Sequence, residues 1–551
     1  FRGNPMTPLR RNAYIHELAG TASLILICLL STAFTVVAQT SVTTYHNDNY
    51  RTGWNSSETV LTPANVNASS FGLLTRVKLD DQVDAQPLLV PNVNITAGGH
   101  QGTHSVVYVV TENDTVYAID ASAGTVLLSQ NLGKPVQWPL GCNNNGPNVG
   151  ITSTPVIDTS SNTLYLIAYT QDSSGPAYRL HALDLGSLTD KMTPAVVTAS
   201  HTLADGTSFV FNATYQRQRP GLLEANGNIY AGFGSFCDYG ANLSRGWLLG
   251  WNASSLAPLS ANQVNDTQAT SPNSFFLSSI WMSGYAPAAD DSGNVVFVTG
   301  NSDPSGTTYD GVTNIQESVI KVSANLTNVV DLFTPSDQGD LDQWDSDFGS
   351  GGVLVLPDQP GSTPHLAVAA GKDSNMYFMN EDHLGGYSTT KNNVLGTYAI
   401  AGGCWCGESY FVDPKDGAAR VVSSGGNRVQ VWKLQTSPTP KLKEVAQASV
   451  SSGQNGGFFT SVSSNGNASP IIWALSRPTS QQTGIGLYAF NPETSGGRMS
   501  LLFKSPAGPW PNQGGDSNQV PTVANGKVYV ASYKELQIYG LTAQALKKPA
   551  K

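Results

Sequence analysis

One stretch of the sequence decides the fold class: Ser105 to Gly133 reads SVVYVVTENDTVYAIDASAGTVLLSQNLG. It contains three runs of β-branched, aromatic and aliphatic residues, which are typical of strands. A polar turn at Glu112 to Asp114 separates the first two runs, and a turn around Ala123 and Gly124 separates the last two. The stretch therefore predicts an antiparallel meander of three strands.

Looser copies of this unit follow along the chain, and hardly any segment has helical periodicity. They lie at Asn162–Leu185, Gly227–Ser254, Gly293–Leu326, Pro364–Gly385, Arg420–Leu434, Pro470–Gly497 and Gly526–Leu541. Repeats about 50 to 70 residues apart are typical of propellers and solenoids. A β-helix is the rival architecture, but its repeat is much shorter. We therefore predict an all-β, eight-bladed β-propeller whose neighbouring blades bury each other's faces.

The composition fits a large globular chain. Of the 551 residues, 40% are hydrophobic and 12% are charged, and 55 Gly and 31 Pro provide for many turns. The formal net charge is -10, and no run of basic residues is longer than two. These features exclude nucleic acid and anionic membrane surfaces as partners.

The first 38 residues predict a secretory signal. Arg10 and Arg11 precede an apolar stretch, Ala22 to Ala38, that ends in small residues. A transmembrane anchor is the alternative, but the stretch is short for a bilayer and contains polar residues. Cleavage after Ala38 would leave a single propeller domain at 39–546 and a tail at 547–551, in a secreted or periplasmic protein without membrane contact.

Four of the five cysteines lie beyond this signal, at Cys142, Cys237, Cys404 and Cys406. An even number of cysteines in an exported protein favours two disulfides, and three pairings are open. Metal binding is the other use of such thiols, but no C-x-x-C motif is present and the eight His are scattered. We expect disulfides and leave their pairing open.

Several motifs resemble those of pyrroloquinoline-quinone (PQQ) propellers. YAIDASAG, with Asp120 and Gly124, is similar to the repeat that ends each blade in that family, although the Trp of that repeat is missing here. Secreted PQQ-binding-like repeat proteins of bacteria have segments similar to Thr43–Asn55, Val83–Val93, Gly150–Asp158 and Arg179–Leu185. The resemblance implies a fold more than an activity, because the superfamily contains quinoprotein dehydrogenases and also propellers that bind no cofactor.

The resemblance to the dehydrogenases implies a cofactor site. The segment Ser279–Asn301 is similar to one in which a Trp lies under the quinone and an Asn binds calcium, which implies Trp281 and Asn301 in these roles. Asp310 stands near the position of the catalytic base. Lys372 stands near that of the cation that contacts the quinone.

Two features of these dehydrogenases are altered. Their adjacent Cys pair is replaced by the single Cys142, and Cys237 and Asp238 stand where a Glu that binds calcium is expected. Asp238 is either a calcium ligand together with Asn301, or the neighbour of a purely structural Cys142–Cys237 disulfide. Asp310 also departs from the family, because it occurs in the order Tyr-Asp-Gly rather than Gly-Asp-Asn.

Each candidate also has a purely structural role open to it. Trp281 is suited to packing between blades, and Asp310 to capping a turn, as Asp often does. Lys372 is equally suited to a place at the edge of a blade. Cys404 and Cys406 either close a tight disulfide or pair elsewhere.

Two functions remain open from the sequence. The first is a quinoprotein oxidoreductase that oxidises an alcohol or sugar with PQQ and calcium. It would pass its electrons to an external acceptor, because no C-x-x-C-H motif for haem attachment is present. The second is a cofactor-free propeller that binds protein or carbohydrate.

Overall fold

The computed structural model describes most of the chain from residue 39 onward. The described residues are 39–144, 146–203, 206–240, 243–261, 263–264, 278–302, 309–312, 314–452, 457–479, 483–511 and 518–543. The predicted signal at 1–38 and the predicted tail at 547–551 lie outside them and stay predictions. Gln39 to Lys551 belong to one compact unit. Within the described part of this unit, no helix has the length and apolar character needed to cross a membrane.

The stretch quoted first forms a meander, as predicted, and one further strand precedes it. The strands pair in chain order: β3 (Leu88–Ile95), β4 (Gly102–Val110), β5 (Thr115–Asp120) and β6 (Val126–Asn131). The turn between β5 and β6 requires Gly124, which has a φ of +70°. A Cβ at this position would also lie 2.8 Å from Cγ2 of Thr75. The turn therefore combines a left-handed conformation with a close approach to β2 (Phe71–Gln82).

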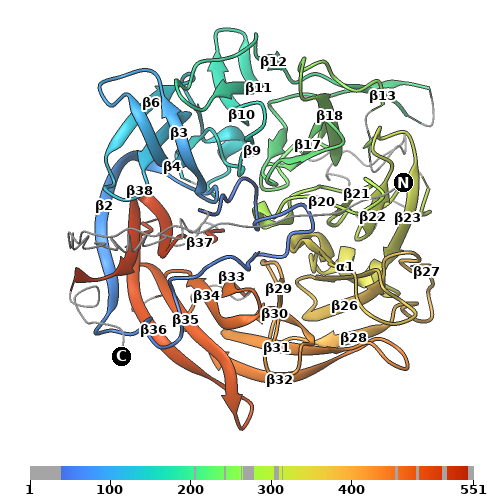
Figure 1. Ribbon diagram of the computed structural model, residues 1–551. Helices are drawn as coiled ribbons and strands as arrows, with labels where there is room; N and C mark the ends of the chain where they lie inside the picture. The colour runs from blue at the N-terminus through green and yellow to red at the C-terminus, as the bar shows by residue number, and fades with distance from the viewer. Residues whose placement is uncertain are drawn as a thin grey trace, which may run out of the picture. The chain divides into compact units, whose positions relative to one another are not determined.

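Similar meanders recur around a centre (Figure 1). The second contains β9 (Val156–Asp158), β10 (Thr163–Asp172), β11 (Gly175–Asp184) and β12 (Ala195–Val196). The third contains β15 (Gln216–Gln218), β16 (Leu223–Ala225), β17 (Asn228–Ser235), β18 (Trp247–Asn252) and β19 (Gln263–Val264). The fourth contains β20 (Ala288–Ala289), β21 (Val295–Val298), β22 (Val319–Val322), β23 (Val329–Thr334) and β27 (Gly386–Tyr387). The fifth contains β24 (Val353–Leu356), β25 (Leu366–Ala370), β26 (Asn375–Asn380) and β28 (Gly396–Ala399). The sixth contains β29 (Ser409–Val412), β30 (Ala419–Gly425), β31 (Arg428–Gln435) and β32 (Lys441–Ser449). The seventh contains β33 (Phe459–Asn465), β34 (Ala468–Ser476), β35 (Gly484–Ser495) and β36 (Arg498–Pro509).

Several other elements are short, and β1 among them pairs with β33. They are β1 (Trp54–Asn55), β7 (Val136–Gln137), β8 (Asn148–Val149), β13 (Ser200–Thr202), β14 (Ser208–Val210), the short helix α1 (Gln338–Gln343) and the 3-10 turns η1 (Pro139–Gly141), η3 (Met282–Gly284) and η4 (Phe348–Ser350). Antiparallel meanders around a centre are typical of a propeller and not of a β-helix, so the predicted all-β propeller is confirmed.

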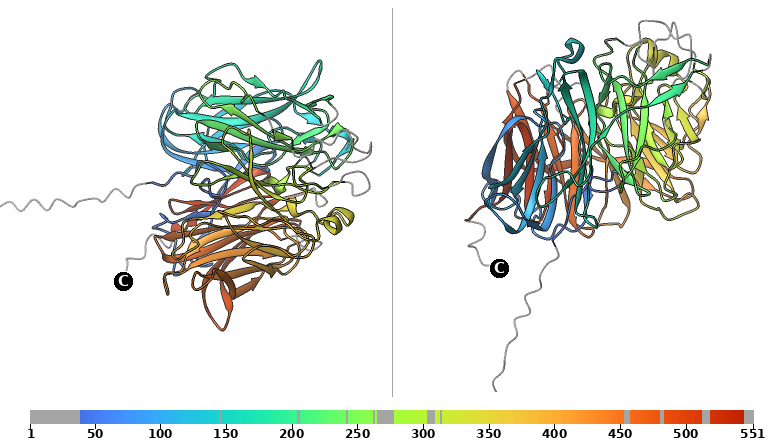
Figure 2. Two further views of the ribbon diagram at one scale, coloured as in Figure 1. Left: turned by 90° about the vertical axis from the view of Figure 1, so that its right-hand side faces the viewer. Right: turned by 90° about the horizontal axis from the view of Figure 1, so that it is seen from above.

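The last sheet joins the two ends of the propeller. It contains β37 (Thr522–Ala524) and β38 (Lys527–Leu541), and β38 pairs with β2 from the start of the described chain. Blue β2 and red β38 lie side by side in Figure 1 and in the right-hand view of Figure 2. The sixth and seventh meanders and β1 form one nine-stranded sheet, in which β32 and β36 are joined only by the pair Gln447 and Arg498. If this sheet is divided at that pair, the described strands fall into eight groups.

The segment from Val42 to Asn55 runs across the centre of the ring (Figure 1). It makes a hydrogen bond to a strand at one edge of each of the eight groups, in chain order. Its partners are Leu89 in β3, Ile157 in β9, Glu224 in β16, Ala289 in β20, Val355 in β24, Tyr410 in β29, Val462 in β33 and Val523 in β37. This segment, which we call the central segment, therefore touches the whole ring.

Arg51 holds the central segment in its shape. Its buried guanidinium donates hydrogen bonds to the carbonyl oxygens of Pro287 at 2.8 Å and of Tyr45 and Asp48 at 3.0 Å. It also donates to Oγ1 of Thr44 at 2.8 Å. A buried cation needs such a set of acceptors, because removal from water without them is costly.

The core lies between neighbouring groups. Ile167 of β10 and Leu180 of β11 share one buried cluster with Ile229 of β17 and Trp247 of β18. Burial of one such side chain stabilises the fold by about 1.5–3 kcal/mol. Each group therefore depends on the next, which explains why so long a chain forms one compact unit.

Candidate functional site

A cavity of about 290 Å³ opens among loops of consecutive groups. We call it the Trp281 pocket; its lining residues are Asn144, Arg217, Arg219, Ser235, Cys237, Asp238, Ser279, Trp281, Asn301, Asp345, Asp347, Lys372 and Trp405. Most of them lie where a strand ends or a loop begins: Asn301 follows β21, Lys372 follows β25 and Trp405 precedes β29. Loops on a rigid scaffold are the usual place for binding residues.

The structure brings four of the residues implied by the resemblance into this pocket: Trp281, Asn301, Asp238 and Lys372. They come from three different groups of strands and are up to 134 residues apart, which is 372 minus 238. Their roles toward a cofactor stay predictions.

Lys372 forms the centre of a charged network. Its ammonium binds a carboxylate oxygen of Asp347 and lies 3.0 Å from Oδ1 of Asp345. Burial alone would lower the pKa of Lys372, but the charges of Asp347 and Asp345 outweigh burial and raise the pKa above its usual value. Lys372 is therefore protonated throughout the physiological range.

The two aspartates differ. Burial disfavours ionisation of Asp347, but the charge of Lys372 and the hydrogen bonds that it receives hold its pKa below the usual value. The pKa of Asp345 is raised by burial and by repulsion from Asp347. The backbone N–H of Asn301 donates to Oδ1 of Asp347 at 2.9 Å, and its side-chain amide donates to Oδ1 of Asp345 at 3.4 Å.

Trp281 has cations close to its ring. Nζ of Lys372 lies 5.5 Å from the ring centroid, and Cζ of Arg219 lies 5.2 Å from it. Lys372 is also 5.6 Å from the ring of Trp405. Such contacts favour a positive charge beside an indole. Gly300 permits the arrangement, because a Cβ there would lie 3.0 Å from Nε1 of Trp281.

Asp238 is held at the rim of the pocket by a disulfide. Cys142 and Cys237 are joined, with Cα atoms 5.5 Å apart. Cys237 and Asp238 both have a positive φ, of 49° and 59°, a conformation uncommon for residues other than glycine. Oγ of Ser235 donates to Oδ1 of Asp238 at 2.8 Å. Removal from bulk water, followed by the charges of Asp347 and Asp345, raises the pKa of Asp238 to about 6.

Two buried oxygen atoms of the pocket have no hydrogen-bond partner within the described residues. They are Oδ1 of Asn301, which is 8% exposed, and Oγ of Ser279, which is 2% exposed. Buried polar atoms are normally paired, so these two are available to a ligand. Sequence reasoning did not find Ser279, because a single serine in a loop carries no signal of its own.

Asp310, the predicted catalytic base, is not among the residues that line the pocket. It is exposed, and its Oδ1 accepts hydrogen bonds from the backbone N–H groups of Val312 and Asn314, both at 2.8 Å. This is the turn-capping role that the sequence also left open. The carboxylates that line the pocket are those of Asp238, Asp345 and Asp347.

The pocket provides some oxygen ligands for calcium and not a full set. Calcium takes about 6 to 8 oxygen ligands. Of the three lining carboxylates, Asp345 and Asp347 bind Lys372, which leaves Asp238 and the amide oxygen of Asn301. Within the described residues, no three acidic, Cys or His side chains of this pocket have ligand atoms within 4.8 Å of one another.

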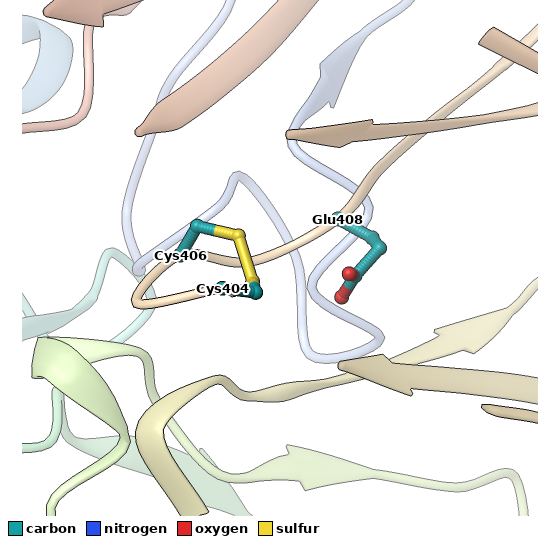
Figure 3. A group of neighbouring side chains, drawn as sticks. All are labelled: Cys404, Cys406 and Glu408. Carbon is teal, nitrogen blue, oxygen red and sulfur yellow. A yellow bond between two sulfur atoms is a disulfide. The ribbon is translucent and has the colours of Figure 1, made fainter. Parts of the chain in front are cut away.

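The second disulfide lies in the loop before β29. It joins Cys404 to Cys406, on either side of Trp405 (Figure 3). Of the pairings that the sequence left open, the structure thus contains Cys142–Cys237 and Cys404–Cys406. Trp405 is half-buried and reaches the pocket.

Solved structures with the same architecture include quinoprotein dehydrogenases. A quinohemoprotein alcohol dehydrogenase from Comamonas testosteroni has a TM-score of 0.60 and 13% identity, covering 92% of this chain and 81% of its own. The fold is that of the PQQ-type propellers. A second PQQ-type propeller, the quinohemoprotein alcohol dehydrogenase ADHIIG from Pseudomonas putida HK5, has a TM-score of 0.60 and 14% identity, covering 93% of this chain and 82% of its own. A europium-containing methanol dehydrogenase has a TM-score of 0.57 and 11% identity, covering 91% and 98%.

No protein-family model and no curated protein matches this PQQ-type propeller by sequence. At identities of 11 to 14%, the structural likeness shows the fold alone. The chemistry must therefore be argued from the Trp281 pocket.

Proposed function

We propose that the Trp281 pocket binds a planar, anionic quinone of the PQQ type and that the protein is an exported oxidoreductase acting on an alcohol or sugar. One observation carries this proposal. An indole, a disulfide sulfur and three basic side chains line the same cavity: Trp281, Cys237, Lys372, Arg217 and Arg219. The two disulfides are consistent with export to an oxidising compartment.

The residues of the pocket fit such a group. Trp281 offers a flat face of the kind on which a planar ring stacks. Lys372 and Arg219, both within 5.5 Å of that ring, suit the carboxylates and carbonyl oxygens of the quinone. Ser279 and Asn301 each add a buried oxygen atom that has no hydrogen-bond partner within the described chain. When bound, PQQ supplies a two-electron acceptor for the carbon that carries the substrate hydroxyl.

Asp238 and Asn301 are the proposed ligands of a calcium ion, since they are the oxygen donors that Lys372 leaves available. The remaining ligands would come from the cofactor and from water. In the neighbouring network, Asp347 orients Lys372, and Lys372 stays charged to donate a hydrogen bond to an oxygen on the pocket side.

A general base takes the proton of the substrate hydroxyl. We assign this role to Asp345, because it lines the pocket and its side chain is 70% exposed, so a substrate can reach it. The family resemblance favours Asp310 instead. If Asp345 is the base, Asp345→Asn lowers turnover by about 100-fold or more and Asp310→Asn does not. The opposite ranking would return the role to Asp310.

The binding step is tested first. The protein, freed of divalent ions, is titrated with PQQ with and without calcium while absorbance and melting temperature are followed. Binding at 100 times Kd would stabilise the protein by about 2.7 kcal/mol. Trp281→Ala and Asn301→Ala should abolish the shift, whereas Trp344→Ala should not, because Trp344 is 74% exposed and outside the pocket. No response to excess PQQ would refute the proposal.

A second function is favoured by the polar and aromatic lining. Two indoles and three carboxylates in one cavity also suit a carbohydrate, which stacks on aromatic rings and forms hydrogen bonds with carboxylates. In that case the protein is a cofactor-free propeller that binds carbohydrate or protein. Sugar binding that Trp281→Ala abolishes, together with no response to PQQ, would establish it.

A further inference from the structure

The loop between β28 and β29 combines a disulfide with a buried acid. Cys404 and Cys406 are bonded through their Sγ atoms, and Glu408 follows two residues later (Figure 3). The two sulfur atoms and a carboxylate oxygen of Glu408 all lie within 4.8 Å of one another. All three residues have an exposure of 0%.

Glu408 has no partner that explains its burial. Neither Oε1 nor Oε2 makes a hydrogen bond within the described chain. A buried carboxylate without donors is costly, because it loses the hydration that stabilises its charge. A buried carboxyl group is therefore expected to pair with something, and the disulfide has no proton to donate to it.

Burial accordingly raises the pKa of Glu408 to about 7. The titratable group that faces it is Tyr285, whose hydroxyl donates to the backbone oxygen of Glu408 at 3.3 Å and whose pKa burial holds well above its usual value. Arg51 and Asp48 of the central segment act electrostatically on the same Tyr285. On the pocket side, Trp405 of this loop borders Lys372, which pairs with Asp345 and Asp347. Glu408 thus exchanges a proton near neutral pH without a charged partner.

The surroundings can accept a reduced pair of cysteines. Sγ of Cys406 lies 3.5 Å from the carbonyl oxygen of Ser424, an acceptor for a thiol proton. The backbone N–H of Cys404 donates to the carbonyl oxygen of Gly371 at 2.8 Å, and its carbonyl accepts from Oγ of Ser350 at 2.7 Å. These backbone bonds do not depend on the disulfide, so they can hold the loop when it opens.

We propose that Cys404–Cys406 is a redox-active disulfide that exchanges with dithiols, and that Glu408 carries protons to and from its sulfur atoms. A dithiol supplies two electrons and two protons. Its two S–H bonds break and one S–S bond forms in it, while the Cys404–Cys406 bond breaks and two S–H bonds form. Protonated Glu408 gives its proton to the leaving thiolate and recovers one from the attacking dithiol.

This site is distinct from the proposed quinone chemistry, although the two are neighbours. Trp405 lies between the two cysteines and lines the Trp281 pocket. Reduction removes the cross-link that fixes this indole, so the redox state of the loop sets the shape of one pocket wall. Both sulfur atoms are fully buried, so exchange with a dithiol requires local opening of this loop.

The test uses dithiothreitol as the dithiol and the full chain. Reduction is stopped by alkylation, and mass spectrometry of peptides follows Cys404–Cys406 and Cys142–Cys237 separately in one sample. The measured quantity is the second-order rate constant corrected for the thiolate fraction of the reagent. For Cys404–Cys406 it should fall about tenfold between pH 6 and pH 8, because Glu408 loses its proton in this range.

Two comparisons keep the test decisive. Glu408→Gln should remove the pH dependence of Cys404–Cys406. The profile of Cys142–Cys237, which lies beside Asp238, should be the same in both proteins. If Glu408→Gln fails to fold, the profile of the unchanged protein still decides. A corrected rate that is flat with pH would overturn the proposal, and so would reduction of Cys404–Cys406 that is independent of dithiothreitol concentration and limited by global unfolding.

Discussion

The two disulfides of this propeller lie close to one pocket and constrain the chain in opposite ways. Cys142 and Cys237 are 95 residues apart and tie together loops of two groups of strands. Cys404 and Cys406 are 2 residues apart and constrain Trp405 alone. By loop-closure entropy, the long loop is worth about 4.7 kcal/mol and the short one about 1.6 kcal/mol. The first disulfide therefore stabilises the fold, and the second positions a side chain.

The largest effect should come from removing the long-range disulfide. Cys142→Ala with Cys237→Ala should lower the free energy of unfolding by about 4–5 kcal/mol, because the unfolded chain regains the entropy of a large loop. Urea denaturation with a constant m-value would measure it. The matched control is Cys404→Ala with Cys406→Ala, and equal losses in the two double variants would break the comparison.

A smaller effect concerns the acid beside the short disulfide. The pKa of Glu408 rises from 4.5 to about 7 on folding, so the folded state holds a proton that the unfolded state releases between these values. Stability should therefore fall as the pH rises from 4.5 through 7, by about 3 kcal/mol for this group.

Glu408→Gln should remove that loss, because the amide does not titrate. Unfolding free energies at pH 4.5 and pH 8 would show it, with the exposed Glu444→Gln as control. A pH dependence that persists unchanged in Glu408→Gln would show that other carboxyl groups cause it.

The smallest effect tests whether the short disulfide positions Trp405 for ligand binding. Cys404→Ala with Cys406→Ala should weaken PQQ binding about tenfold, or 1.4 kcal/mol, since Trp405 must then lose rotational freedom when the ligand binds. Absorbance titration would measure the affinity, and Trp405→Ala would set the scale for complete loss of the indole. Unchanged affinity in the double variant would mean that packing alone holds Trp405.

The sequence was sufficient for the fold because each blade repeats the same local pattern. The runs of β-branched, aromatic and aliphatic residues in Ser105–Gly133 indicate strands directly, and the spacing of the copies along the chain indicates a ring. The resemblance also pointed to Trp281, Asn301 and Lys372, which the fold brings into one cavity. These residues stand in recognisable segments next to strands.

Other features of the site have no local signature. Nothing in the sequence around Asp310 shows that its carboxylate is occupied by the N–H groups of Val312 and Asn314. The pairing of Lys372 with Asp345 and Asp347 joins loops 25 to 27 residues apart. Burial of Glu408 without a donor depends on the surrounding packing, which a single sequence does not encode in readable form.

The central segment imposes an order in time. Asn55 donates to the carbonyl oxygen of Val523, which is 468 residues later. At a synthesis rate of about 5–20 residues per second, roughly 25 to 90 seconds pass between the appearance of these two partners. During that interval, only some of the eight strands that bind the central segment have been synthesised. The central segment is thus synthesised first and is among the last parts of the ring to obtain all its hydrogen-bond partners. Until then, it must be protected from aggregation for longer than any other part of the ring.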